Sequence, residues 1–345
     1  MTTAGRSLVT ACLALYHLVS QGAAPEAEIV SPTLRARLFL PDAQTGFYRG
    51  TRFDWSGVIG SLTFAGHEFF PTWFDRSDPE VHDFVDRGNE IVAGPCTAIT
   101  GPAEEFVASG KALGFEEAKP GGTFVKIGVG VLRRPDDRPY DPFRLYPIVD
   151  SGRWTVSPRS NAVEFVQSVN DAASGYGYEY RKTVSLATDR ARLLLSHHLR
   201  NTGARVIRTS VYNHNFLYLD RQPPGPEISL QFPFALRAVD GPANSLGLIQ
   251  GNRIEFSRTL AGEDRVHLNL QGFGTEAKDH DIRVEHRGLG VGVRIIGDRP
   301  LSRLALWSIR APVSIEPFVD LAVPAGAETE WQIRYEFYEL KHDSR

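Results

Sequence analysis

Short stretches in which apolar and polar residues alternate recur along most of the chain. Between Gln332 and Leu340, the apolar residues Ile333, Tyr335 and Phe337 alternate with polar neighbours. Side chains two positions apart share one face of a β-strand, so this spacing predicts a strand with one buried face. The same spacing recurs at Val266, Leu268 and Leu270, and at Ile254 and Phe256.

Turn signals rich in glycine and proline separate these stretches, and long amphipathic helical patterns are missing. The 32 glycines and 22 prolines of the 345-residue chain fit a turn-rich β protein better than a helical one. We therefore predict an all-β fold, built as one large antiparallel β-sandwich. No break in composition divides the chain after its N-terminal segment, so we expect residues 25–345 to form a single domain. The turn signals lie at residues 54–57, 120–122, 223–225 and 324–326.

The first residues of the chain are typical of an export signal. Arg6 precedes an apolar stretch at residues 8–19, and residues 21–24 contain small side chains suited to cleavage. The stretch is shorter than the ~20 apolar residues that a membrane span needs. We expect residues 1–24 to be an export signal and the protein to be periplasmic or secreted. The alternative is a buried N-terminal helix in a cytoplasmic protein.

The charges of the chain are nearly balanced, with 38 Lys and Arg residues against 41 Asp and Glu residues. Nucleic-acid-binding proteins concentrate Lys and Arg, so this balance argues against a nucleic-acid partner. No polybasic run is present, so we expect no membrane partner beyond the export signal. The two cysteines are Cys12 and Cys96, and cleavage of the signal would leave Cys96 without a disulfide partner in the chain.

One histidine and one glutamate, far apart in the sequence, are candidates for acid/base chemistry. His214 lies in the strand-like run of residues 211–220, and Glu316 lies between the apolar Ile315 and Pro317. Burying an unpaired carboxylate is costly, so Glu316 must be exposed, paired or functional. Histidine titrates near neutral pH, so the two residues could move protons on a substrate. A purely structural role stays open for His214, because histidines in strands often have one.

The segments around these two residues resemble galactose mutarotase (aldose 1-epimerase) proteins. Residues 213–216 (Asn-His-Asn-Phe) are similar to the Asn-His-aromatic strand of that family, and residues 315–317 (Ile-Glu-Pro) are similar to its late glutamate motif. Residues 193–203, which end in Asn-Thr-Gly, and residues 321–337 are similar to further strands of the family, in the same order. Together these motifs cover about residues 175–340. The resemblance implies a mutarotase-type supersandwich.

The resemblance also implies a carbohydrate-active enzyme that interconverts the anomers of a free sugar or an oligosaccharide. A base must remove the proton of the anomeric hydroxyl while an acid protonates the ring oxygen, so that the ring opens and closes again. By resemblance, Glu316 would be the base and His214 the acid, on opposite sides of the sugar. The neighbouring Asn213 would bind the substrate.

The chain departs from the family's pattern in one respect. Mutarotases usually carry a second histidine in an upstream His-Gly segment, whereas residues 93–106 contain no histidine. In this place Glu104 and Glu105 would supply carboxylates to bind the substrate. Because two carboxylates flank the reactive bond in glycoside hydrolases, a hydrolase or a polysaccharide lyase on the same fold is an alternative function. A solvated turn is the alternative for Glu104 and Glu105 themselves.

Residues 48–55 combine arginine, aspartate and tryptophan in one short segment, which is typical of sugar binding. We expect Arg52 to orient the substrate and Trp307 to offer an aromatic face to it. The alternative is that Arg52 pairs with Asp54 across a turn and that the tryptophans belong to the core. The charged residues 133–142 predict a solvated loop, and loops on a β scaffold often border a site.

No motif in the sequence requires a cofactor or a metal ion. The glycine-rich residues 288–292 are followed by no helical pattern, so they lack the context of a dinucleotide-binding motif. The adjacent His197 and His198 would point to opposite faces of a strand and could not chelate one ion together. We therefore expect no cofactor and no required metal. A third interpretation is a non-catalytic module that binds sugar without turning it over, because a fold does not fix a function.

Overall fold

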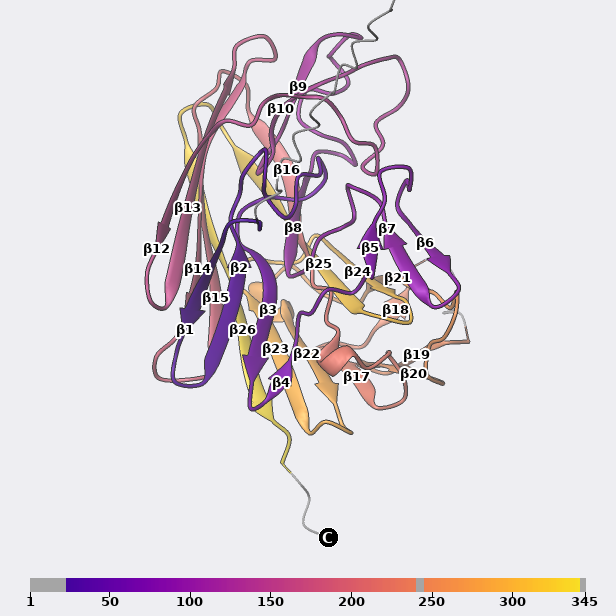
Figure 1. The fold of residues 1–345 in the computed structure, drawn as a ribbon. Helices are drawn as coiled ribbons and strands as arrows, with labels where there is room; N and C mark the ends of the chain where they lie inside the picture. Colours follow the sequence, from indigo (N-terminus) through magenta and orange to yellow (C-terminus); the bar gives the residue numbers. More distant parts are fainter. Residues whose placement is uncertain (1–22, 240–244, 342–345) are drawn as a thin grey trace, which may run out of the picture.

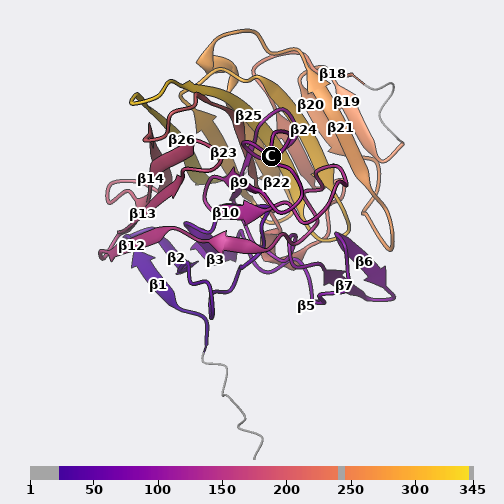
Figure 2. The ribbon, with the colours of Figure 1, turned by 90° about the horizontal axis from the view of Figure 1, so that it is seen from above.

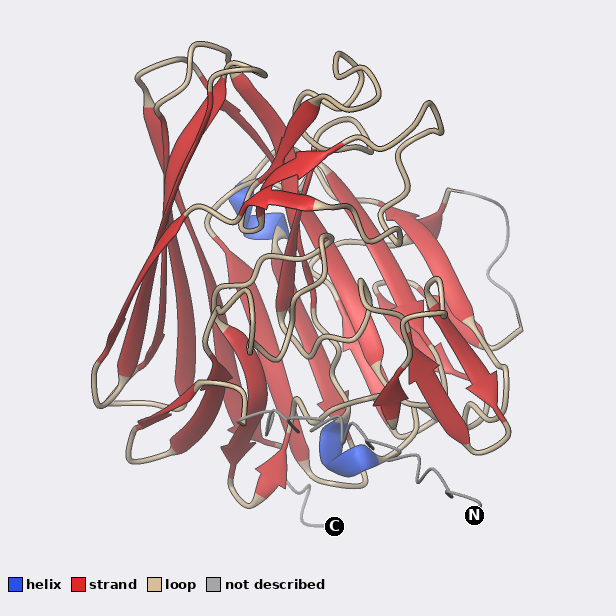
Figure 3. Cartoon of the chain, turned by 45° about the horizontal axis from the view of Figure 1, so that its top comes forward, coloured by secondary structure: helices blue, strands red, loops and turns tan. Residues whose placement is uncertain are grey.

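The computed structural model describes residues 23–239 and 245–341. Within these ranges the chain forms β-strands and two single-turn 3-10 helices, η1 (Leu219–Arg221) and η2 (Ala277–Asp279) (Figure 3). The prediction of an all-β fold is confirmed. In the described ranges no helix is long and apolar enough to cross a membrane. Residues 1–22, nearly all of the predicted export signal, lie outside these ranges, so the signal stays a prediction.

The largest sheet has ten antiparallel strands (Figure 1). Its long strand β26 (Glu328–Glu339) buries Trp331, Ile333, Tyr335 and Phe337 and leaves most of the intervening side chains more exposed. The alternation predicted from the sequence is therefore confirmed in this strand. In spatial order the sheet contains β12 (Arg153–Pro158), β13 (Ala162–Asp171), β14 (Tyr176–Leu186), β15 (Arg192–Asn201), β26, β23 (Val291–Gly297), β22 (Asp281–His286), β17 (Ile228–Gln231), β20 (Arg253–Phe256) and β19 (Gly247–Gln250).

The second large sheet has six antiparallel strands and brings segments from both halves of the chain together. Its edge strand β8 comes from the N-terminal third, whereas its central strands come from the second half of the chain. In spatial order it contains β18 (Arg237–Ala238), β21 (Val266–Gln271), β24 (Arg303–Ser308), β25 (Val313–Val323), β16 (Ile207–His214) and β8 (Ala103–Val107).

Apolar side chains of the two large sheets pack against one another. Ile295 and Ile333 of the ten-stranded sheet belong to the same buried cluster as Leu306 and Ile315 of the six-stranded sheet. Full burial of one such side chain is worth about 1.5–3 kcal/mol, so this layer contributes strongly to the stability of the fold. The predicted large antiparallel β-sandwich is therefore confirmed.

Three smaller sheets lie along one side of the large ones (Figure 2). All strand pairs within them are antiparallel except the parallel pair β5–β7. Their loops, all from the first 150 residues, cover the outer face of the six-stranded sheet. The strands are β1 (Glu26–Val30), β2 (Leu34–Phe39), β3 (Val58–Phe64) and β4 (His67–Glu68); β9 (Thr123–Lys126), β10 (Gly130–Arg133) and β11 (Ile148–Asp150); and β5 (Arg76–Ser77), β7 (Glu90–Ala93) and β6 (Phe84–Arg87).

A buried cluster of charged groups joins the two large sheets inside the sandwich. Glu104 of β8 lies 2.6 Å from Lys182 Nζ of β14 and 2.7 Å from His197 Nε2 of β15. All three side chains are at most 1% exposed. Burial opposes ionisation of Glu104, but His197 and Lys182 hold the pKa of its carboxyl well below the usual range. The cluster therefore contains a buried carboxylate that stays ionised near neutral pH because of its partners.

Replacement of Lys182 by methionine is expected to destabilise the fold by about 3–5 kcal/mol, because it leaves buried carboxylates without their cation. The matched control is Arg35→Ala, which removes a cation from a pair with Glu28 whose side chains are 60% and 50% exposed. That control is expected to cost at most about 1 kcal/mol. Urea unfolding at neutral pH measures both; equal losses would contradict the structural role given to Lys182.

Candidate functional site

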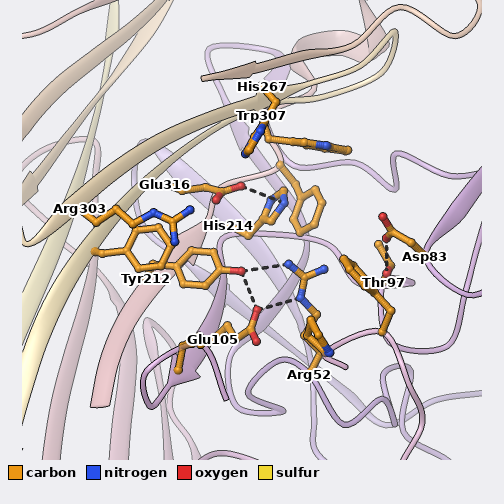
Figure 4. A pocket seen from close by; sticks show the side chains of 16 residues that line it. Arg52, Asp83, Thr97, Glu105, Tyr212, His214, His267, Arg303, Trp307 and Glu316 are labelled. Atoms are coloured by element: carbon orange, nitrogen blue, oxygen red, sulfur yellow. Dashed lines mark hydrogen bonds and ion pairs between the residues drawn. The ribbon is translucent and has the colours of Figure 1, made fainter. Parts of the chain in front are cut away.

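A pocket of about 290 Å³ opens on the outer face of the six-stranded sheet (Figure 4). Its floor is formed by side chains of β8, β16, β24 and β25, and its walls come from loops of the N-terminal part of the chain. Within the described residues it contains five of the seven side chains that the sequence nominates as a site. These are Arg52, Glu105, His214, Trp307 and Glu316.

The floor of the pocket consists of cross-strand rows of side chains. In one row, Glu105 lies opposite Tyr212, Tyr212 opposite Phe318, and Phe318 opposite Arg303. Residues that lie directly opposite in antiparallel strands have their side chains on the same face of the sheet. One backbone register therefore aligns four strands so that a carboxylate, a phenol, an aromatic ring and a guanidinium face the same pocket.

The next row holds the two candidate acid/base residues. His214 lies opposite Ala103, and Glu316 lies opposite Ala305. The pairing of β16 with β25 ends at Tyr212 and Phe318, and His214 and Glu316 follow two residues further along the same register. Their side chains are in contact, since His214 Nε2 lies 3.2 Å from Glu316 Oε1. The two residues that the sequence motifs suggested as an acid/base pair are therefore in direct contact.

Both members of this pair are withdrawn from solvent and held by aromatic neighbours. The side chains of His214 and Glu316 are only 7% and 11% exposed. The imidazole stacks on Phe216, with ring centroids 3.7 Å apart, and meets the edge of Trp307 at 5.1 Å. Among the described residues, the buried Nδ1 of His214 has no hydrogen-bond partner. The ring is therefore fixed by packing, with Nε2 directed at the carboxyl group.

Burial also sets the protonation of the pair. It raises the pKa of Glu316 to about 7, although the cations Arg52 and Arg303 pull in the opposite direction. It lowers the pKa of His214 well below the ordinary value, and Arg52 lowers it further. Near neutral pH the imidazole is thus neutral, and a substantial fraction of Glu316 carries a proton. A proton donor and a proton acceptor lie side by side.

Glu105 has a different environment in the same pocket. Three groups donate hydrogen bonds to its carboxylate: Arg52 Nε at 2.8 Å, Tyr212 Oη at 2.6 Å and Lys126 Nζ at 2.9 Å. Burial opposes its ionisation, but the nearby charges of Lys126 and Arg52 lower the pKa of Glu105 to about 2. Glu105 is therefore a fixed anion that positions its partners rather than a group that exchanges protons near neutral pH.

Arg52 is the group that Glu105 positions. Its guanidinium lies between two aromatic rings, 4.5 Å from the centroid of Phe53 and 4.7 Å from that of Phe143. A second nitrogen donates to the hydroxyl of Tyr212 at 3.1 Å. Figure 4 shows the guanidinium directed into the pocket beneath His214. Held on three sides, it can offer a hydrogen-bond donor to a substrate oxygen at little entropic cost.

The loop between β10 and β11 forms one wall of the pocket. Its residues Pro142 and Phe143 line the cavity, so the charged loop predicted at residues 133–142 does border the site. The loop is linked to a neighbouring segment through His82 Nε2, which lies 2.6 Å from Asp141 Oδ2. Trp307 of β24 also lines the pocket and adds an aromatic ring to it.

Two residues nominated from the sequence lie elsewhere. Glu104 and Asn213 face the interior of the sandwich, where the Asn213 amide donates to Glu104 at 3.2 Å. Neither lines the pocket. The cause is the alternation of side chains along a strand: Glu105 and His214 face the pocket, so their neighbours in sequence face away. The structure therefore separates the two adjacent glutamates into a scaffold residue and a pocket residue.

Arg52 and Asp54 do not pair with each other, which was the alternative considered for this segment. Asp54 is buried, and its carboxylate accepts hydrogen bonds from Ser56 and from Tyr180. Trp55 is buried in the core and donates to the carbonyl oxygen of Gly50 at 2.8 Å. The segment therefore contributes Arg52 alone to the pocket.

Motif patterns did not point to Tyr212 and Arg303, which line the pocket, or to Lys126, which lies outside the lining and donates to Glu105. Tyr212 precedes His214 by two positions, so strand alternation could have placed it on the same face. Arg303 likewise shares a face with Trp307 of the same strand. For Lys126 the sequence holds no comparable signal. Within the described ranges no group of three or more His, Cys, Asp or Glu residues is placed to hold a metal ion.

Comparison with known proteins gives results for structure only. No family model matches the sequence, and no curated protein matches it. Among solved structures, the GalM/aldose epimerase homologue from C. elegans has a TM-score of 0.54 and 15% identity, covering 92% of this chain and 100% of that one. The Slr1438 protein from Synechocystis sp. PCC 6803 has a TM-score of 0.53 and 13% identity, covering 94% and 100%.

A galactose mutarotase-like protein from Lactobacillus casei ATCC 334 is similar to the same extent, with a TM-score of 0.50 and 14% identity over 91% of this chain and 100% of that one. The chain therefore has the fold of galactose mutarotase-like proteins, as its sequence motifs imply. At these identities the likeness extends to the fold and not to activity or substrate.

The environment of Glu316 leads to a prediction about stability. Its pKa of about 7 in the folded protein exceeds the ordinary value of 4.5, so the folded state binds this proton more tightly than the unfolded chain does. The resulting stabilisation is present below pH 4.5 and is lost as the pH rises through about 7. Glu316→Gln is therefore expected to be more stable than the wild type at pH 8, by about 3 kcal/mol, and nearly equal to it at pH 4.

Urea unfolding of both proteins at the two pH values measures this difference, and titrating groups far from residue 316 cancel in the comparison. The control is Glu330→Gln, since Glu330 is an exposed glutamate of β26, and it is expected to change stability little at either pH. A Glu316→Gln variant that is less stable than the wild type at pH 8 would show that the carboxylate is stabilised by its surroundings.

Proposed function

We propose that the protein interconverts the anomers of a sugar by acid/base opening of its ring. The observation that carries this proposal is the contact of 3.2 Å between His214 and Glu316 on the floor of a pocket. The pair combines a neutral imidazole with a carboxyl group of raised pKa. The fold is that of galactose mutarotase-like proteins, which supports the same function.

The side-by-side arrangement suits the chemistry of a hemiacetal. The anomeric hydroxyl oxygen and the ring oxygen are bonded to the same carbon, so two adjacent groups on one side of the sugar can serve both. His214 accepts the proton of the anomeric hydroxyl through Nε2, and Glu316 donates its proton to the ring oxygen. The bond between the anomeric carbon and the ring oxygen breaks, and an open-chain aldehyde forms.

Rotation about the next carbon–carbon bond and reversal of these transfers give either anomer. After ring opening His214 carries the added proton and Glu316 is ionised. Ring closure returns one proton to the carbonyl oxygen and takes one from the hydroxyl group, so the pair regains its starting state. These roles are the reverse of those implied by the family resemblance, because burial leaves the proton on Glu316 rather than on His214.

Arg52 completes the site electrostatically. Its guanidinium is fixed by Glu105 and Tyr212 and points into the pocket. A fixed donor of this kind can stabilise an oxygen that gains negative charge as its proton leaves. The rings of Phe143 and Trp307 give the pocket apolar walls against which a pyranose can pack.

A second candidate function is cleavage of a glycosidic bond, and the observation that favours it is the position of Glu105 in the same pocket as Glu316. Glu316, with its raised pKa, would be the acid and Glu105 the nucleophile or base. However, Glu105 accepts hydrogen bonds from Arg52, Tyr212 and Lys126, which reduces its nucleophilicity. We therefore favour mutarotation. A binding module without turnover is the remaining alternative.

Proton NMR of the anomeric signals tests the proposal directly. Freshly dissolved α-sugars are expected to equilibrate faster with the wild-type protein, and His214→Asn or Glu316→Gln is expected to lower the catalysed rate by at least about 100-fold. His198→Asn and Glu330→Gln are matched controls outside the pocket and should retain the rate. New reducing-end or unsaturated signals from oligosaccharides would instead identify a hydrolase or a lyase. Binding without any chemical change would identify a binding module.

The pH dependence of catalysis tests the assignment of roles. If Glu316 is the acid, it must be protonated, so kcat/KM should fall as the pH rises through about 7. The pKa of His214 lies well below 6.5, so the imidazole stays able to accept a proton on both sides of that step. The rate in buffer alone is subtracted at each pH. If kcat/KM instead increases as the pH rises through about 7, Glu316 acts as the base and not as the acid.

A further inference from the structure

We propose that the sugar bound in this pocket carries a carboxylate, as a uronic acid does, and that Arg303 binds it. This inference rests on the proposed function and adds the class of substrate to it. Three features of the pocket lead to it: a guanidinium that pairs with no carboxylate of the described residues, an excess of positive charge around the acid/base pair, and the order of the groups along the sheet.

The first feature is the state of Arg303. Its guanidinium stacks on Phe318, 4.6 Å from the ring centroid, and one nitrogen donates to the neutral amide oxygen of Asn269 at 3.1 Å. No carboxylate of the described residues lies within ion-pair distance of it. Stacking fixes the plane of the guanidinium and leaves further N–H donors directed along its edge. Such an edge matches the two oxygens of a carboxylate.

The second feature is the charge balance of the pocket. Glu105 is one carboxylate paired with two cations, Arg52 and Lys126. Arg303 adds a third cation, whereas Glu316 is ionised only in part near neutral pH. The floor of the pocket is therefore positive, although the chain as a whole has a net charge of −3.

The wall of the pocket that contains Asp83 and Thr97 does not offset this positive charge. Asp83 lines the pocket there and accepts a hydrogen bond from Thr97 at 2.8 Å. The nearby Asp86 pairs with both Arg265 and Arg310, at 2.7 and 3.1 Å. Two aspartates and two arginines leave this wall close to neutral, so an anionic group is favoured at the Arg303 end of the pocket.

The third feature is the order of the groups. Arg303, Glu316 and His214 succeed one another across β24, β25 and β16 (Figure 4). In a pyranose uronic acid, the carboxylate is attached to the carbon next to the ring oxygen, and the ring oxygen is attached to the anomeric carbon. A carboxylate on Arg303 therefore brings the ring oxygen to Glu316 and the anomeric hydroxyl to His214. The order of atoms in the substrate matches the order of the groups that would serve them.

A carboxylate fits this end of the pocket better than a phosphate does. A phosphate monoester carries close to two negative charges at pH 7, whereas Arg303 is a single cation. The other two cations, Arg52 and Lys126, are already engaged by Glu105. A planar carboxylate needs only the edge of one planar guanidinium. Both anions share the same basic chemistry, so the test includes a sugar phosphate.

The experiment combines calorimetric binding with anomer equilibration by NMR. The probes are D-glucuronate, D-galacturonate, D-glucose, D-galactose and D-glucose 6-phosphate, each with the wild type, Arg303→Met, Arg303→Lys and the control Arg200→Met, since Arg200 is exposed on β15. The wild type is expected to bind and convert a uronate at least about tenfold better than the matching neutral sugar. Arg303→Met should remove that preference, Arg303→Lys should restore part of it, and Arg200→Met should keep it.

The outcomes separate this inference from the function on which it rests. Tenfold or greater preference for a uronate that disappears in Arg303→Met supports the carboxylate site, even if no sugar equilibrates faster and mutarotation is refuted. Equal conversion of neutral and acidic sugars supports mutarotation and overturns the carboxylate site. A preference for D-glucose 6-phosphate over both uronates that is lost in Arg303→Met overturns it in favour of a phosphate. Absence of binding to every probe overturns both proposals.

Discussion

The pocket depends on one geometric constraint, the register in which β8, β16, β25 and β24 pair. That register places Glu105, Tyr212, Phe318 and Arg303 in one row. It brings His214 and Glu316 into contact in the next row. A shift of a single residue in any of these pairings would turn the side chains of that strand to the opposite face. The packing of the two large sheets therefore fixes the site as well as the fold.

The two adjacent glutamates of β8 show how scaffold and site share one strand. Glu104 faces inward to Lys182 and His197, and Glu105 faces outward to Arg52 and Lys126. Each carboxylate is buried, so each requires cations of its own. In the described part of the chain no Lys or Arg lies within ion-pair distance of Glu316, so burial outweighs the more distant Arg52 and Arg303 and raises its pKa to about 7. The two carboxylates of β8 and the carboxyl group of Glu316 thus differ in protonation near neutral pH because their nearest partners differ.

The sequence predicts the architecture more fully than the site. Alternation of apolar residues is a local property, which is why the all-β sandwich could be predicted, and the short motifs around His214 and Glu316 identify a pair that the structure brings together. Alternation in β24 could have placed Arg303 on the face of Trp307, but its position beside Phe318 and near Glu316 depends on pairing with β25, which no local pattern records. Glu104 and Glu105 could have been separated by alternation if β8 had been recognised as a strand.

In the proposed mechanism His214 and Glu316 act on the sugar as one coupled unit, and a double-mutant cycle on the catalysed equilibration rate measures this coupling. The rate is measured for the wild type, His214→Asn, Glu316→Gln and the double variant with the best substrate. The double variant is expected to be scarcely slower than either single variant, because loss of one partner already disables the unit. Losses that multiply would instead show that His214 and Glu316 act independently, and the coupled mechanism would be wrong.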